Sequence, residues 1–289
     1  MKSMKRLTAL VCAVLMAATL AACGSSQSGA ASASASSAGS SASGSAATGK
    51  KTLTLGFDAE YPPYGYKDDK GNYVGYDIDL AKEACSRLGW ELILQPIDWD
   101  SKDLELNSGN IDVIWNGMTM TGREDQYTWI GPYVDNSIVF VVRSDSGINT
   151  KADLKGKAVV TQSGSSALTA LTDDPGDGSN DENLALAKSF SVLDQSPDYN
   201  SAFMNVESGA DDAVAVDIGV AKYQIQSRGD KFKMMEEPLS TEQYGIAFKL
   251  GNTALRDQVK GALDEMWKDG TFMKISDTWG LSDMICYGD

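Results

Sequence analysis

Polar and glycine residues follow four of the segments that we predict to be strands. These are Asp58 after the first strand, Asn116-Gly117 after the third, Ser163-Gly164-Ser165 after a later one, and Asp217 after another. In open α/β sheets, ligands bind just beyond the carboxyl ends of the strands. Carboxylate, amide, hydroxyl and glycine groups therefore gather where a ligand cleft would lie.

The residue types argue against several kinds of catalysis. The chain has no histidine, which excludes His-based triads, His general bases and His metal sites. No Ser-x-x-Lys or Gly-x-Ser-x-Gly sequence occurs. Asp77 and Asp79 could suggest a catalytic carboxylate pair, but residues two apart on a helix do not face each other. We interpret them as an N-terminal cap and a structural contact, and we expect no metal and no cofactor.

Charge and composition limit the class of protein. The 289 residues include 25 Lys and Arg against 40 Asp and Glu, a formal charge of −15, whereas a nucleic-acid-binding protein would present a basic face. Hydrophobic residues make up 42% and charged residues 22%, which is ordinary for a globular protein. The length allows one large domain or two smaller ones.

Strand and helix patterns alternate from residue 50 onward. Apolar alternation or short apolar runs predict strands over 51–58, 91–97, 111–115, 137–142, 158–161, 213–216 and 244–248. Helical spacing predicts helices over 78–88, 165–171 and 218–226, a short one near Leu104, and a long one through Leu255, Val259, Leu263, Met266 and Trp267. This alternation predicts an α/β fold.

The first 49 residues carry export signals. Basic residues before an apolar run from Leu7 to Ala22 are typical of a signal peptide, predicted over 1–22. The sequence Leu-Ala-Ala-Cys ending at Cys23 resembles the lipobox of bacterial lipoproteins, which implies cleavage before Cys23 and lipid on its sulfur. The alternative is an ordinary signal peptide with an incidental cysteine. Of the 26 residues in 24–49, 24 are Ser, Ala or Gly, so 23–49 is predicted to be a lipid anchor and disordered linker.

Several later segments resemble the amino-acid-binding proteins of bacterial ABC importers, the family-3 solute-binding proteins. They are LGFDAEYPPY at 55–64, GNYVGYDIDLA at 71–81, NGMTMTGR at 116–123, LKGK at 154–157 followed by 159–166, and DGT at 269–271 before Trp279. The match runs from about Lys51 to Leu281, and it rests on the order and spacing of these motifs together.

The resemblance implies a periplasmic-binding-protein-like fold, with two α/β lobes joined by two crossing hinge strands and the ligand between them. Lobe 1 would comprise 50–136 plus 245–289, and lobe 2 would comprise 137–244. The crossings would fall near 134–137 and 241–244. The lobes are expected to close around a ligand by hinge bending.

The resemblance also assigns the charged groups of the cleft. Arg123 would hold the ligand carboxylate through paired hydrogen bonds, although only Gly122 separates it from Thr121 where the family usually has two residues. A surface arginine paired with Glu124 or Asp125 is the alternative. The N–H of Ser166, at a helix start with Ser165, would also face the carboxylate. Simple N-capping by serine is compatible with that role. Asp217 would accept the α-ammonium, or would only cap a helix.

The resemblance also assigns roles to the remaining site residues. Asn116, Gly117 and Thr119 would supply a carbonyl and a hydroxyl at the ammonium end. Tyr61 and Trp99 would be the aromatic walls beside the ligand side chain, and Asp58 would face the end of that side chain. A carboxylate there favours a guanidinium, an ammonium or an amide.

Two cysteines remain after Cys12 and Cys23. An extracellular location permits a disulfide between Cys85 and Cys286, and the alternative is that they are not bonded to each other. The resemblance implies that the C-terminal tail returns to the lobe that carries Cys85.

The sequence therefore predicts an extracellular, lipid-anchored, monomeric protein that captures a polar L-amino acid, cationic or not, and delivers it to an ABC permease. It would bind no nucleic acid and would not be an enzyme. Two alternatives remain: a ligand-sensing accessory protein for a receptor, and a secreted lipoprotein hydrolase with carboxylate-only chemistry.

Overall fold

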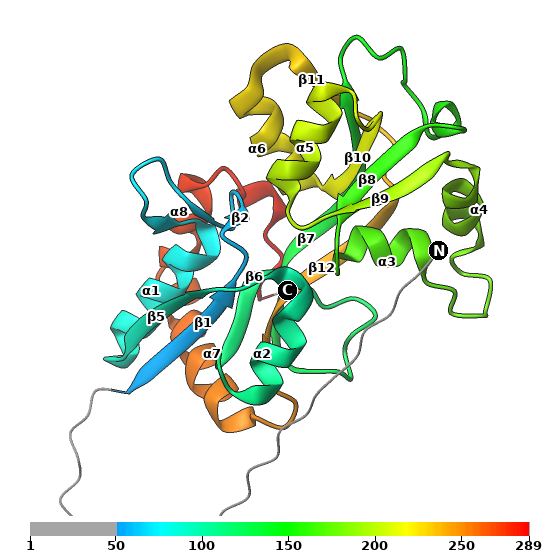
Figure 1. Cartoon of the computed structure of the whole chain (residues 1–289). Helices are drawn as coiled ribbons and strands as arrows, with labels where there is room; N and C mark the ends of the chain where they lie inside the picture. The colour runs from blue at the N-terminus through cyan, green and yellow to red at the C-terminus, as the bar shows by residue number, and fades with distance from the viewer. Residues whose placement is uncertain (1–50, 289) are drawn as a thin grey trace, which may run out of the picture. The chain divides into compact units, whose positions relative to one another are not determined.

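The computed structural model describes residues 51–288 (Figure 1). The predicted signal peptide, Cys23 and the linker lie outside the described residues. Between residues 51 and 288, no helix combines the length and the apolar composition that a membrane crossing needs.

Nine strands form one sheet in the order β5-β1-β6-β12-β7-β10-β8-β9, with β11 also paired to β7. Their bounds are β1 Thr52–Phe57, β5 Glu91–Pro96, β6 Val113–Thr119, β7 Thr128–Arg143, β8 Ala158–Gln162, β9 Val192–Ser196, β10 Ala213–Asp217, β11 Phe232–Met234 and β12 Ser240–Phe248. A small second sheet contains β2 Glu60–Tyr61, β3 Gly65–Lys67 and β4 Tyr73–Val74. The β5-β1-β6 group is parallel, and so is the β10-β8-β9 group.

Two long antiparallel strands connect these groups. Strand β7 pairs with β12 over its first part and with β10 and β11 over its last part, while β12 also pairs with β6. We call the half with β1, β5 and β6 the first lobe and the half with β8, β9 and β10 the second lobe. The predicted architecture of two α/β lobes joined by two crossing strands is confirmed. The strand predicted over 137–142 begins much earlier, at Thr128. The sequence pattern did not predict this first part, because Pro132, Asp135 and Asn136 interrupt its apolar residues.

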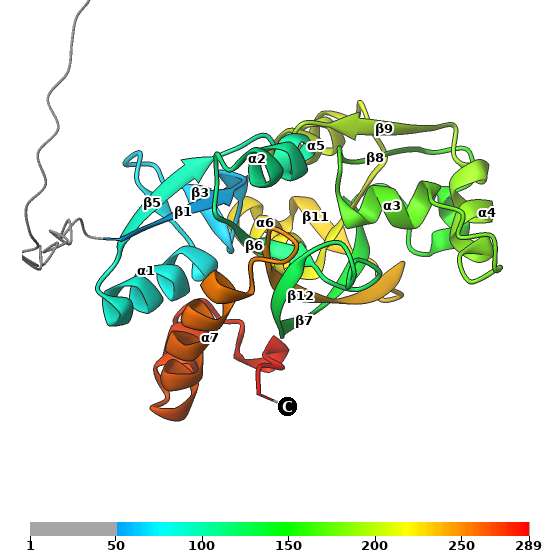
Figure 2. The same cartoon turned by 90° about the horizontal axis from the view of Figure 1, so that it is seen from below.

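The helices divide between the lobes. Their bounds are α1 Tyr76–Leu88, α2 Lys102–Ser108, α3 Ser166–Thr172, α4 Asp181–Ser189, α5 Tyr199–Ser208, α6 Ile218–Arg228, α7 Thr253–Lys268 and α8 Thr271–Thr278. In the first lobe, α1 and α7 lie on one face of the sheet and α2 on the other (Figure 2). Helices α3 to α6 pack with the second lobe. The predicted helices are present, whereas α4, α5, β9, β11 and the small sheet of β2, β3 and β4 were not predicted.

The start of α1 corrects one prediction. Neither aspartate caps the helix, because the N-cap position is Gly75 and no side-chain cap is made there. Asp77 is instead fully buried, and its two oxygens accept hydrogen bonds from Gly117 N at 2.8 Å and Tyr133 OH at 2.9 Å. Asp79 makes the expected structural contacts, with Lys82 and with Trp279 Nε1. Asp77 therefore holds the carboxyl-terminal part of β6 at Gly117, which borders the cleft.

The cysteine pair yields a first prediction. Cys85 lies on α1, and Cys286 donates its backbone N–H to Tyr133 O; both side chains are buried. We expect a disulfide between them, since the C-terminal tail returns to the first lobe. Thiol titration of a denatured, unreduced domain that begins at residue 50 should find no reactive thiol, and the reduced sample should show two. Two reactive thiols before reduction would contradict the pairing.

Candidate functional site

Residues from both lobes enclose a small cavity, which we call the inner cleft. It is lined by Tyr61, Trp99, Gly117, Thr119, Arg123, Gln162, Ser165, Ser166, Tyr199 and Asp217. The sequence predicted all of these except Gln162 and Tyr199. The cavity volume is about 10 Å³, which is enough for roughly one water. An amino acid can therefore enter only when the lobes move apart.

Arg123 reaches the inner cleft despite the short spacing before it. Gly122 adopts a positive φ of 76°, and Arg123 N bonds to Met120 O at 2.9 Å, so the chain turns tightly there. The guanidinium donates a long hydrogen bond of 3.4 Å to Thr119 O. Within residues 51–288 it forms no ion pair, so the alternative of a surface pair with Glu124 or Asp125 is not observed. Its donors are available to an anion in the cleft.

Asp217 ends β10 and directs its carboxylate into a polar network. It stands at the N-cap position of α6 but makes no side-chain cap. Its Oδ1 accepts hydrogen bonds from Asn136 Nδ2 and Tyr244 OH, both at 2.7 Å, and Tyr244 OH is bonded to Tyr61 OH. Burial raises the pKa of Asp217, and the bonds from Tyr244, Tyr61 and Asn136 partly oppose that rise. The carboxylate is therefore a buried group without a cationic partner in the described part of the chain.

The hydroxyl residues of the cleft meet a carboxylate that the sequence did not predict. Ser165 caps α3, as its Oγ accepts from Leu168 N at 3.1 Å. Ser166 Oγ and Thr119 Oγ1 both donate to Glu242 Oε1, at 3.1 and 2.8 Å. Glu242 lies on the crossing strand β12 in a polar sequence, Ser-Thr-Glu-Gln, which gives no local signal of a buried acid.

Two aromatic rings face each other across the cleft as predicted. The rings of Tyr61 and Trp99 are nearly parallel, at 4°, with centroids 6.5 Å apart. Two layers of van der Waals contact need about 7 Å, so a small separation of these rings would admit a planar or aliphatic group. Tyr199 packs against Tyr61 at 5.9 Å and adds a third ring. Asn116, by contrast, does not line the cleft, because its Oδ1 accepts the backbone N–H of Asp58.

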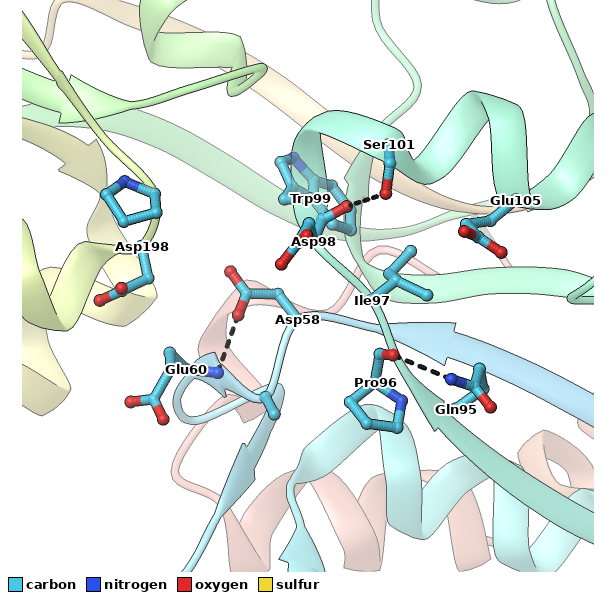
Figure 3. A pocket seen from close by; sticks show the side chains of 12 residues that line it. Asp58, Glu60, Gln95, Pro96, Ile97, Asp98, Trp99, Ser101, Glu105 and Asp198 are labelled. Atoms are coloured by element: carbon cyan, nitrogen blue, oxygen red, sulfur yellow. Dashed lines mark hydrogen bonds between the residues drawn. The ribbon is translucent and has the colours of Figure 1, made fainter. Parts of the chain in front are cut away.

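A second cavity, the outer pocket, lies beyond Asp58 and Trp99 (Figure 3). Its volume is about 430 Å³, and its lining carries the carboxylates of Asp58, Glu60, Asp98, Glu105 and Asp198 but no lysine or arginine. Burial raises the pKa of Asp58 to about 6, with the charge of Asp198 adding to the rise. In the described part of the chain, no group of three Asp, Glu, Cys or His side chains is arranged to hold a metal ion. The acidic lining of the outer pocket favours a positively charged group.

Contacts between the lobes separate the two cavities. Gln162 Nε2 of the second lobe donates to Asp58 Oδ2 of the first at 2.6 Å. Nearby, Lys102 Nζ donates to Gly164 O at 3.2 Å, and its burial lowers the pKa of the ammonium. A ligand whose side chain replaced Gln162 as the partner of Asp58 would connect the inner cleft to the outer pocket.

The fold and site match a known class of binding protein. Residues 53–282 match the family of bacterial extracellular solute-binding proteins, family 3, and the chain belongs to that family. It is 29% identical over 236 residues to the L-cystine-binding protein TcyJ of Escherichia coli strain K12, covering 81% of this chain and 84% of that protein. It is 30% identical over 233 residues to the arginine-binding extracellular protein ArtP of Bacillus subtilis strain 168, covering 80% and 86%.

Solved structures agree with this assignment. The crystal structure of Tv2483 bound to L-arginine superimposes with a TM-score of 0.74 at 27% identity, covering 82% of this chain and 93% of that chain. The inner cleft thus lies between the lobes of a solute-binding fold.

Proposed function

We propose that the protein captures a free L-amino acid between its lobes and delivers it to an ABC importer. The observation that carries this proposal is that one cleft is lined both by Arg123 and by a buried Asp217. Asp217 has no cationic partner in the described residues. A zwitterion presents one carboxylate and one ammonium, and each needs a partner when it is removed from water. The cystine- and arginine-binding relatives support the same ligand class.

The preferred ligand in this proposal has a cationic side chain. With its α-groups on Arg123 and Asp217, the side chain would pass between Tyr61 and Trp99 toward Asp58. Beyond Asp58 it would meet the acidic lining of the outer pocket. Arginine and lysine satisfy this arrangement. Cystine would bring a second ammonium but also a second carboxylate, which the acidic pocket disfavours.

A thermal-shift screen tests the proposal. The twenty amino acids, ornithine and cystine would be compared at equal concentrations with the domain that begins at residue 50. Ligand at one hundred times its Kd should raise the stability by about 2.7 kcal/mol. Arginine or lysine should give the largest shift. A screen in which no amino acid shifts the melting temperature would contradict the proposal.

We also propose that the protein works as a monomer, breaks no bonds, and presents both closed lobes to the permease. The family consists of solute-binding proteins, which supports this view. A receptor-linked sensor would use the same cleft. Uptake of labelled ligand by cells with and without the protein distinguishes the two, because a sensor alone would leave uptake unchanged.

The proposed membrane anchor gives a second prediction. If Cys23 carries the lipid, Cys23→Ser should be released into the medium or remain unprocessed, since the Ser/Ala/Gly tract over 24–49 has no apolar surface to hold it. Fractionation with a high-salt wash, detected by immunoblot, measures this. Membrane retention equal to that of the wild type, in a variant whose signal peptide has been cleaved, would rule out the lipid anchor.

A further inference from the structure

Glu242 is a carboxylate beside the inner cleft to which the proposed ligand assignment gives no role. It lies on β12 directly opposite Asn136 of β7, at the crossing of the two lobes, and its residue surface is 9% exposed. It lines a pocket that shares Thr119, Arg123 and Ser166 with the inner cleft. A buried carboxylate in this position needs a partner that the fold itself must supply or a ligand must bring.

The two carboxylate oxygens of Glu242 differ in the number of hydrogen bonds they accept. Its Oε1 accepts three, from Thr119 Oγ1 of the first lobe, Asn136 Nδ2 of the crossing strand, and Ser166 Oγ of the second lobe. Within residues 51–288, its Oε2 accepts none. One carboxylate oxygen therefore connects both lobes, while the other is available to a further donor.

Glu242 and Asp217 form a pair. The single nitrogen Asn136 Nδ2 donates to Asp217 Oδ1 at 2.7 Å and to Glu242 Oε1 at 2.9 Å, so the two carboxylates lie on either side of one amide. No lysine or arginine in the described part of the chain forms an ion pair with either of them. Two buried like charges at this separation repel each other.

The surrounding groups do not neutralise this pair. Burial and the charge of Asp217 raise the pKa of Glu242 to about 7. The other titratable groups near it are Arg123 after β6, which forms no ion pair with it, Asp173 after α3, Asp135 of β7, and three tyrosines, Tyr64, Tyr199 and Tyr244. Burial raises the pKa of each tyrosine well above 10, so all three are neutral. Without ligand, the carboxylates of Asp217 and Glu242 can thus reduce their repulsion by holding a proton.

A second observation points to a ligand at the same place. The hydroxyl of Tyr199 lies near Thr161 and Ser165 but makes no well-formed hydrogen bond in the described residues, although the side chain is fully buried and lines the inner cleft beside Asp217. Buried hydroxyls are normally satisfied. An ammonium group at Asp217 and Glu242 would bring polar atoms close to the buried hydroxyl of Tyr199.

We propose that Glu242 is a ligand-binding residue which, with Asp217, forms a two-carboxylate subsite for the ligand ammonium. The inference rests on the proposed function. In the empty protein the pair shares a proton, and the arriving ammonium replaces it. The bound ammonium keeps all its own protons, and the displaced proton passes to the buffer, so charge and atoms balance. Binding is therefore linked to proton release.

A competing role for Glu242 predicts proton exchange in the opposite direction. Thr119 and Ser166 hydroxyls could serve the ligand carboxylate, and Glu242 would then compete with it. A carboxylate that approaches Glu242 would cause proton uptake, and removal of the Glu242 charge would strengthen binding. The direction of proton exchange thus separates the two roles.

Isothermal titration in buffers of different ionisation enthalpy measures the proton count. The probes are L-arginine, L-lysine and L-cystine, with the tightest binder carried forward. At pH 7 the wild type should release roughly 0.5 proton per ligand, the protonated fraction of a group whose pKa is about 7. Its Kd should rise by up to about tenfold for each pH unit below 7. Zero exchange or net uptake at pH 7 would overturn the inference.

The Glu242→Gln variant tests whether Glu242 is the group that releases the proton. It should release about 0.1 proton or less, bind at least about tenfold more weakly at pH 8, and lose most of the pH dependence. Glu236→Gln, at an exposed glutamate before the same strand, should match the wild type. Unchanged proton release or tighter binding in Glu242→Gln would overturn the inference. If Glu242→Gln does not fold, the wild-type proton count still decides.

The two proposals fail differently. If none of the three probes binds to the wild type, the proposed function is wrong and this inference falls with it. If a probe binds without proton release, only the role of Glu242 is wrong.

Discussion

Arg123→Ala and Asp217→Asn are each expected to weaken amino-acid binding by about 30- to 4,000-fold. Each change leaves one charge of the ligand buried without its partner, and such losses amount to about 2–5 kcal/mol, at roughly 1.4 kcal/mol per tenfold. The loss should be similar for every amino acid that the protein accepts, since all share the α-carboxylate and the α-ammonium. Isothermal titration against the two best ligands of the screen measures it.

Matched controls separate this effect from a general change in charge. Lys188→Ala and Asp230→Asn remove single charges from exposed sites in the second lobe, and both should bind like the wild type. Circular dichroism checks that all variants fold. Binding of folded Arg123→Ala within about threefold of the wild type would show that the tight turn at Gly122 has moved the arginine off the ligand.

Asp58→Asn is expected to change the ranking of ligands rather than remove binding. Cationic ligands should lose about 30-fold or more, because a buried carboxylate that pairs with a guanidinium or ammonium becomes a neutral amide. Glutamine should change by less than about threefold. Asp69→Asn, which removes an exposed carboxylate of the first lobe that lines neither cavity, should have little effect on either. Equal losses for arginine and glutamine would contradict the placement of Asp58 at the side-chain end.

The same variant should change how stability depends on pH. Burial raises the pKa of Asp58 from 3.8 to about 6, so between those values the folded protein binds more protons than the unfolded chain. Its contribution to stability is therefore present below about pH 4 and is lost as the pH rises toward 6. The loss is about 3 kcal/mol, at 1.36 kcal/mol per pKa unit. In urea titrations without ligand, Asp58→Asn should gain stability relative to the wild type across this range. A difference that stays constant from pH 4 to 7 would contradict the shift.

The sequence predicted the parts of the site that follow directly from strand ends. Asp217 comes immediately after the apolar run Ala213–Val216, and the structure has a fully buried strand there with the carboxylate at its end. Gly117 and Thr119 belong to β6, whose seven residues are all buried. In both cases the local pattern defines the strand, and the edge of the sheet brings the residues together.

The residues that were missed acquire their roles only through contacts between the lobes. Gln162 ends β8 and is significant because it bonds to Asp58 across the cleft, 104 positions away. Tyr199 begins a helix that had no predicted boundary, and Glu242 lies in a short polar segment of β12. No pattern of 2 or 3.6 residues marks such positions. Asp77 was misread for the same reason: its partners Gly117 and Tyr133 are distant in sequence, whereas a helix start favours a cap.

The most direct test of the binding account is a double-mutant cycle between Arg123 and the ligand carboxylate. Wild type and Arg123→Ala would each be titrated with L-arginine and with agmatine, which is arginine without its carboxylate. We predict that Arg123→Ala weakens the binding of L-arginine by about 30-fold or more but that of agmatine by less than about threefold, since agmatine has no group for the guanidinium to hold. Equal losses for the two ligands would show that Arg123 does not contact the carboxylate and would contradict the account.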